Sequence, residues 1–219
     1  MTEIADFAAE GVRGWLHRPA SAAKGGLVLT HGAGSDCGAP LLVSVSSAFA
    51  EAGYCVLRCD LPFRQCRASG PPGRADAAAD RAGLRAAAAA LRALVPGPLL
   101  LGGHSYGGRQ ASLLAAEEPG AADALLLLSY PLHPPKKPSS LRTAHFPHLV
   151  TPAAFVHGER DAFATRAELS AAIAAIPAAT RLLPVDGAGH DLRRGRFDLA
   201  PVVEALVGLV PRAARPRPR

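Results

Sequence analysis

Short apolar runs alternate along the chain with longer segments in which apolar residues recur at helical spacing. The runs lie at residues 26–31, 54–60, 99–102, 124–130, 153–157 and 181–185. They are apolar on both faces, which is typical of parallel strands that helices cover on either side. An earlier strand or hairpin is predicted around Trp15, within residues 10–19.

The segments between these runs are long enough for helices. Helices are predicted at residues 41–52, 75–94, 105–118, 165–176 and 198–210. Gly53, Pro119 and Pro177 lie where a helix ends. The alternation predicts one α/β domain over residues 1–210, with a mostly parallel central sheet, helices on both faces and right-handed crossovers.

Composition narrows the class of protein. Hydrophobic residues make up 49% of the 219 and charged residues 19%, which excludes a disordered chain. No apolar run approaches the roughly 18 residues of a membrane helix. The start of the chain, residues 1–6, is acidic where a secretory signal is basic. We therefore expect a cytoplasmic protein with no membrane partner.

The net charge of +6 is concentrated at the C-terminus. Residues 211–219 carry four arginines and no acid, which leaves +2 for the rest of the chain. Prolines interrupt this segment, so we expect a disordered Pro/Arg-rich tail. It has no aromatic residue on which a base could stack, and no nucleic-acid partner is expected.

The cysteines at positions 37, 55, 59 and 66 form no C-x-x-C pair and no zinc-type cluster with histidine. Cys55 and Cys59 share a face of one predicted strand, which favours burial as small apolar residues. The chain also lacks the G-x-G-x-x-G and Walker motifs of nucleotide sites. Reduced thiols and the absence of any metal or cofactor are the expectation.

The strongest chemical motif is G-x-S-x-G at residues 103–107. It follows an apolar run and opens a helical one, and a strand that turns sharply into a helix forces the serine into a strained conformation. Gly103 and Gly107 are the positions where a side chain would collide with the neighbouring backbone. Ser105 is therefore the candidate nucleophile.

A serine hydroxyl needs a base that takes its proton and an acid that orients the base. Asp161 follows the strand at 153–157, and His190 lies in a glycine-containing loop after the strand at 181–185. Such loops bring both side chains toward Ser105 at one end of the sheet. We predict His190 as base and Asp161 as acid.

Other residues compete for these roles. Glu159 lies two positions before Asp161, and Asp186 and Asp191 flank His190. We expect Asp186 to stabilise its loop and Asp191 to cap the following turn. Structural roles are predicted for His31, His104 and His157, and at most lining roles for the histidines at 133, 145 and 148, whereas His17 is assigned no role.

Catalysis at a carbonyl also needs backbone donors for the developing oxyanion. The sequence H-G-A-G at residues 31–34 follows the first strongly apolar strand, where glycine lets the backbone approach a substrate. The amides of Tyr106 and Ala33 are the predicted donors, with Gly34 as the alternative to Ala33.

Arg109 lies one helical turn after Ser105 in a helix that should pack on the sheet. A buried arginine needs a partner, and an ion pair with Asp60 is the favoured interpretation, with a substrate carboxylate as the alternative. The loops at 61–73 and 131–138 follow strands and are either pocket walls or plain surface loops.

From about Gly14 to Leu209 the chain resembles an α/β-hydrolase without a cap domain, related to the dienelactone hydrolases. More narrowly, it is similar to the hydrolase-like domain shared by a testis-expressed protein and the third subunit of the NSL histone-acetyltransferase complex. Five segments carry this resemblance: 31–34, 102–109 (GGHSYGGR), 129–138 (SYPLHPPKKP), 158–163 (GERDAF) and 187–193 (GAGHDLR).

The resemblance implies Ser105, Asp161 and His190 as the catalytic triad. Dienelactone hydrolases proper use cysteine as nucleophile, so their substrate is not carried over. We expect a serine hydrolase that cleaves an ester or thioester of a small acyl substrate. The connection of about 22 residues between Tyr130 and Ala153 is too short for a helical lid, which predicts an open pocket. The alternative is a hydrolase-shaped interaction module.

Overall fold

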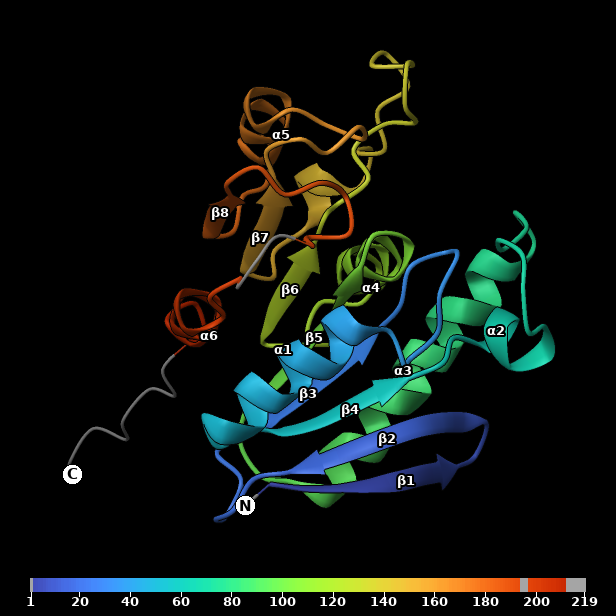
Figure 1. Cartoon of the computed structure of the whole chain (residues 1–219), viewed down its shortest axis with the longest axis vertical. Coiled ribbons are helices and arrows are strands. Elements are labelled where there is room, and N and C mark those ends of the chain that lie inside the picture. The colour runs from blue at the N-terminus through green and yellow to red at the C-terminus, as the bar shows by residue number, and fades with distance from the viewer. Residues whose placement is uncertain (1, 194–196, 212–219) are drawn as a thin grey trace.

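The computed structural model describes residues 2–193 and 197–211, and a sheet of eight strands runs through it (Figure 1). In chain order the strands are β1 (Glu3–Ala9), β2 (Val12–Arg18), β3 (Gly26–Thr30), β4 (Cys55–Cys59), β5 (Leu99–His104), β6 (Ala124–Leu128), β7 (Ala153–Gly158) and β8 (Thr180–Val185). Their order in the sheet is β1-β2-β4-β3-β5-β6-β7-β8. From β4 to β8 all neighbours are parallel, whereas β2 is antiparallel to both β1 and β4.

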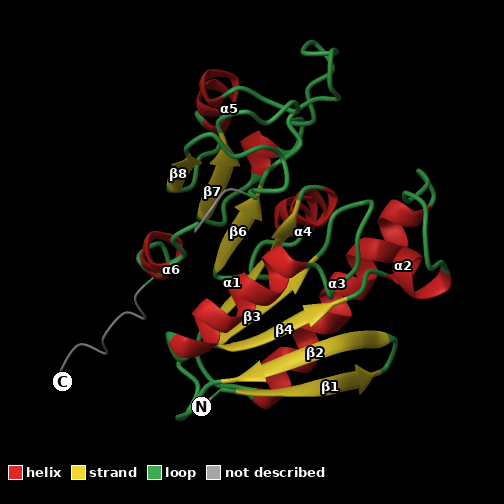
Figure 2. Ribbon diagram, in the orientation of Figure 1, coloured by secondary structure: helices red, strands yellow, loops and turns green. Residues whose placement is uncertain are grey.

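Helices cover both faces of this sheet (Figure 2). They are α1 (Pro40–Glu51), α2 (Pro62–Cys66), α3 (Asp76–Leu94), α4 (Tyr106–Glu117), α5 (Arg166–Ile173) and α6 (Ala200–Val207), with a 3₁₀ turn at Phe146–His148. Leu84 of α3 and Leu114 of α4 lie in the core on one face, and Phe49 of α1 and Leu206 of α6 lie in the core on the other. The predicted α/β architecture, a mostly parallel sheet with helices on both faces, is thereby confirmed.

The predicted strands after residue 25 match β3 to β8 within two residues at each end. The last two helices end three residues earlier than predicted. The start of α5 is fixed by a capping box, in which the side chains of Thr165 and Glu168 satisfy each other's backbone N–H groups. Cys55 and Cys59 are buried in one core cluster, as their spacing predicts.

The N-terminal hairpin begins earlier than the sequence predicts. Its first strand starts at Glu3, and the chain reverses at Glu10 and Gly11, which both have positive φ. Most residues of β1 are exposed, so this strand lacks the apolar run by which the others were found. The predicted loop at 61–73 likewise contains α2, which begins at Pro62, a residue suited to a first helical turn.

The edge strand β8 contains a proline. Ala153 of β7 donates from its backbone N to the carbonyl of Ala179, and Glu159 donates to that of Val185. Because alternate residues of a strand point their backbone groups to opposite sides, the N of Pro184 faces away from β7.

Two predictions concern a membrane helix and the C-terminal tail. Within residues 2–193 and 197–211, no helix combines the length and apolar character needed to cross a bilayer. The tail predicted at 211–219 falls, from residue 212 onward, outside the described residues.

Candidate active site

Ser105 lies in the sharp turn between β5 and α4. Its φ of 51° and ψ of −114° are a strained combination for a residue with a side chain. A Cβ on Gly103 would lie 2.6 Å from the carbonyl oxygen of Thr30, and one on Gly107 would lie 2.5 Å from that of His31. The collisions predicted for a side chain at either position are confirmed. Because both residues are glycines, the turn can lie tightly against the end of β3.

Ser105, His190 and Asp161 come together at the carboxyl ends of β5, β8 and β7. The Oγ of Ser105 lies 2.8 Å from Nε2 of His190, and Nδ1 of His190 lies 2.8 Å from Oδ2 of Asp161. The carboxylate can only accept at this distance, so Nδ1 carries the proton and Nε2 is free to accept from the serine hydroxyl.

The environment of Asp161 fixes its orientation. Its side chain is fully buried, whereas a quarter of the His190 side chain is exposed. The second carboxylate oxygen accepts a hydrogen bond of 2.8 Å from the backbone N–H of Phe163. The competing acids bond elsewhere: Glu159 accepts from the N–H of Gly187, and Asp191 accepts from that of Arg193.

Two further side chains hold the His190 imidazole, and sequence reasoning did not assign them this role. The Phe163 ring lies 4.2 Å from it between centroids, at an interplanar angle of 30°. On the backbone side, Nε2 of His104 lies 2.8 Å from the carbonyl oxygen of His190. Burial lowers the pKa of His104, which keeps it neutral, and its Nε2–H is the donor to this carbonyl.

The predicted oxyanion donors, Ala33 and Tyr106, border the same cavity as Ser105. Within the described residues, no acceptor pairs with the backbone N–H of either one. A Cβ on Gly32 would lie 2.9 Å from the His104 ring, so glycine lets this loop approach the Ser105 turn.

Arg64 supports the donor loop from behind. Its buried guanidinium donates to the carbonyl oxygens of Ser35, at 2.9 Å, and Ala33, at 3.1 Å. Two further bonds tie it to the carbonyls of Arg67 and Gly70. Backbone carbonyls as partners leave no pattern of residue types, so the sequence could not identify Arg64.

The cavity beside Ser105 has a volume of about 640 Å³. The loop at 61–73 contributes Pro71, Pro72 and Gly73 to its wall, and the loop at 131–138 contributes Pro131. Both loops therefore form walls of the pocket and are not plain surface loops.

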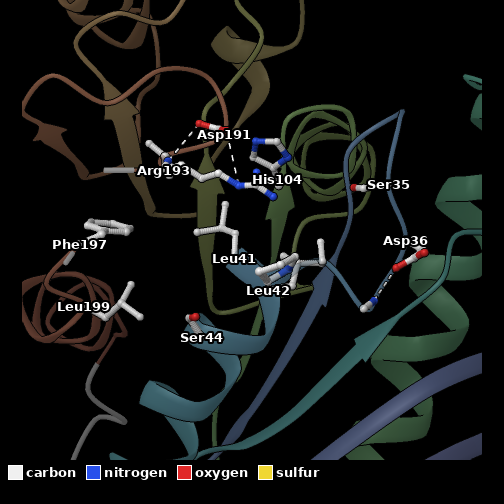
Figure 3. A pocket seen from close by; sticks show the side chains of 14 residues that line it. Ser35, Asp36, Leu41, Leu42, Ser44, His104, Asp191, Arg193, Phe197 and Leu199 are labelled. Carbon is white, nitrogen blue, oxygen red and sulfur yellow. Dashed lines mark hydrogen bonds and ion pairs between the residues drawn. The ribbon is translucent and has the colours of Figure 1, made fainter. Parts of the chain in front are cut away.

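A second cavity is lined by residues of α1, of the segment before it and of the segments at 191–193 and 197–199 (Figure 3). Its lining includes the apolar Leu41 and Leu199, together with His104 and Asp191, the residue after His190. Ser105 borders only the first of these two cavities, so any reaction at its Oγ belongs there.

The favoured ion pair between Arg109 and Asp60 is wrong. Oδ1 of Asp60 accepts from the backbone N–H of Cys37 at 2.7 Å and lies 3.7 Å from the His31 ring. Arg109 instead borders the Ser105 cavity, and its Nε is buried without a hydrogen-bond partner among the described residues. Its location agrees with the alternative, a partner supplied by the substrate.

No group of three or more His, Cys, Asp or Glu side chains in the described ranges is arranged to hold a metal ion. Each of the four cysteines is a free thiol.

Comparison with known proteins gives the same architecture. The sequence family described as alpha/beta hydrolase domain matches residues 23–199. The dienelactone hydrolase of Anabaena variabilis superposes with a TM-score of 0.72 at 21% identity, over 96% of this chain and 99% of that one.

Two other solved structures are similar at lower identity. Est1E of Butyrivibrio proteoclasticus, solved with ferulic acid, is 18% identical, with a TM-score of 0.70 over 92% of this chain and 95% of that one. XC6422 of Xanthomonas campestris, described as a serine hydrolase without a lid, is 16% identical, with a TM-score of 0.69 over 95% of this chain and 93% of that one. At these identities the likeness concerns the fold.

Proposed function

The chain belongs to the alpha/beta hydrolase domain family, and from that premise we propose that it is a serine hydrolase that cleaves an ester or thioester of a small acyl substrate. The observation that carries the proposal is the continuous hydrogen-bonded series from Ser105 through His190 to Asp161, with 2.8 Å at both links. This is the arrangement by which a neutral serine becomes a nucleophile at neutral pH.

In the proposed first step, Oγ of Ser105 attacks the carbonyl carbon of the substrate while its proton passes to Nε2 of His190. Asp161 stabilises the resulting imidazolium through Nδ1–H. The carbonyl oxygen becomes an oxyanion that accepts from the N–H groups of Ala33 and Tyr106. Because Arg64 and the strained Ser105 turn fix these donors beforehand, little reorganisation is needed during the reaction.

The intermediate then collapses. The bond from the carbonyl carbon to the alcohol or thiol breaks, His190 gives its proton to that leaving group, and the acyl group stays on Ser105. A water molecule attacks the acyl-enzyme, passes a proton to His190, and releases the carboxylic acid as Oγ regains its proton. Substrate and water are thereby converted into an acid and an alcohol or thiol.

The alternative, a hydrolase-shaped interaction module, would tolerate a separated serine and histidine and a filled pocket. The short Ser105–His190 distance and the cavity of about 640 Å³ at Oγ support catalysis instead. The narrower similarity to the NSL-associated hydrolase-like domain remains a proposal. So does a cytoplasmic location, with which the free thiols agree.

A fluorophosphonate probe followed by peptide mapping tests the proposed nucleophile. We expect the label on the peptide that contains Ser105, and hydrolysis of 4-nitrophenyl acetate that Ser105→Ala abolishes. Ser170→Ala, the same change at an exposed serine of α5, is the matched control and should retain both properties. Equal hydrolysis by wild type and Ser105→Ala would overturn the proposed mechanism.

A further inference from the structure

The cavity beside Ser105 is lined by positive charge. Arg109 comes from α4, Arg142 from the segment after β6, and Arg74 from the loop before α3. Among the described residues that line this cavity there is no aspartate or glutamate. Three elements far apart in sequence therefore bring guanidinium groups to one hollow without a carboxylate to balance them.

Three arginines of the segment between Arg67 and Arg85 have carboxylate partners. Arg67 pairs with Asp76, Arg81 with Glu117, and Arg85 with Glu118. No such carboxylate pairs with Arg74, Arg109 or Arg142 within the described ranges. Arg74, Arg109 and Arg142 thus differ from these three arginines in bringing charge without a paired carboxylate to the cavity.

Among the residues that the structure describes, two buried donors beside this cavity have no acceptor. One is Nε of Arg109, and the other is the amide nitrogen of Gln110, whose side-chain oxygen accepts from Arg81 at 3.2 Å. Burying a donor without a partner is unfavourable, so such groups are usually satisfied by protein, water or ligand. Both residues border the hollow, so these two buried donors lie directly behind its wall.

A second hollow of about 400 Å³ continues from this cavity, since Arg109 and Arg142 border both. His145 also borders it, and burial together with the charge of Arg109 lowers the His145 pKa to about 4. Burial and the charge of Arg109 also lower the pKa of Arg142. The two arginines therefore repel each other, and a bound anion would relieve that repulsion.

We propose that the Ser105 cavity selects esters or thioesters whose acyl part ends in a carboxylate, such as half-esters of dicarboxylic acids. Arg109 and Arg142 would bind the carboxylate, which the planar guanidinium group matches with paired hydrogen bonds. This inference rests on the proposed serine-hydrolase function and names the substrate class of the same site.

The position of Arg109 sets the length of the acyl chain. Residues four apart on a helix have Cβ atoms about 6 Å apart, and the arginine side chain extends beyond its own Cβ. A carboxylate a few carbons from the carbonyl under attack thus comes within reach of Arg109. Dicarboxylic acids of about four to six carbons have this separation.

The test compares two ethyl esters that differ only at the far end of the acyl chain, monoethyl adipate and ethyl hexanoate. We expect wild type to have a kcat/KM for monoethyl adipate about tenfold or more above that for ethyl hexanoate, because hydrogen bonds to charged groups are among the stronger ones. Arg109→Gln and Arg142→Gln should each reduce this ratio several-fold, whereas Arg181→Gln, at an exposed position on β8, should leave it unchanged.

A ratio near one in wild type, or one that Arg109→Gln leaves intact, would overturn the inference. Ser105-dependent cleavage of ethyl hexanoate in the same experiment would leave the proposed hydrolase function standing. Binding to the Ser105→Ala protein, measured by calorimetry, provides a readout independent of turnover. Monoethyl adipate should bind at least tenfold more tightly than ethyl hexanoate. Equal affinity, or tighter binding of inorganic phosphate than of adipate, would contradict a carboxylate site even if no ester were cleaved.

Discussion

Nε2 of His104 lies 2.8 Å from the carbonyl oxygen of His190, so the residue before the nucleophile bonds to the backbone of the catalytic base. The two rings are 5.2 Å apart between centroids. One side chain thereby links the Ser105 turn to the His190 loop, two segments that are 85 residues apart in sequence.

His104 is therefore expected to act as a positioning residue. His104→Ala should lower kcat for an aryl ester about 100-fold, because a small displacement of a catalytic group is costly, with little change in KM. His104→Gln, whose amide can donate to the same carbonyl, should recover a large part of kcat. Equal losses in the two variants would show that the ring, and not its hydrogen bond, is what matters.

Asp161 is expected to be the acid that orients His190. Asp161→Asn should reduce kcat by about 10⁴ without unfolding the protein, because an amide in place of the carboxylate favours the wrong tautomer of the imidazole. Asp191→Asn, beside the base but bonded to Arg193, should change kcat only slightly. Steady-state hydrolysis of an aryl ester distinguishes the two, and a comparable loss in both would contradict the assignment.

The glycines of the nucleophile turn are expected to differ from other loop glycines in their effect on stability. Gly103→Ala should lower the free energy of unfolding by about 3 kcal/mol or prevent folding, since its Cβ would meet backbone atoms of β3 and α4. Gly34→Ala places a Cβ in open space and is the matched control. Urea denaturation measures both, and similar midpoints would show that the turn relaxes around the added methyl group.

Acidification is expected to destabilise the fold through His17. Burial, and secondarily the charge of Arg58, lower its pKa from 6.5 to about 4. Between these values the unfolded chain binds the extra proton, so stability is retained above pH 6.5 and lost as the pH falls toward 4. The loss attributable to His17 is about 3 kcal/mol.

Urea unfolding of wild type and His17→Gln between pH 7 and pH 4 tests this linkage. Glutamine retains an acceptor for the Arg58 Nε, so the variant should fold and should show a weaker decline in stability with acidification. His148→Gln replaces an exposed histidine and should follow the wild-type curve. A wild-type slope in His17→Gln would show that other groups account for the acid sensitivity.

The sequence located the central strands, the five longer helices and the three residues of the Ser105–His190–Asp161 series. Buried parallel strands are apolar throughout, and G-x-S-x-G in a strand–turn–helix context specifies one backbone geometry. The sequence did not predict β1, because most residues of this strand are exposed and it contains no apolar run.

The supporting contacts were hidden for a different reason. Arg64 and His104 bond to backbone carbonyls, which every residue type provides, so no pairing of residue types marks them. For Arg109 the residue types suggested a carboxylate partner in Asp60, but the backbone of Cys37 occupies that carboxylate. Only the three-dimensional arrangement distinguishes such competing acceptors.

Pro184 has a consequence for contacts between molecules. Its nitrogen lies on the outer side of β8 and carries no hydrogen, which leaves Thr180 and Leu182 as the outward backbone donors of that strand. A strand from another copy could therefore form only a short hydrogen-bonded ladder here, because its carbonyl opposite Pro184 would find no N–H donor. At this edge, Pro184 thus limits how far the sheets of two copies could join.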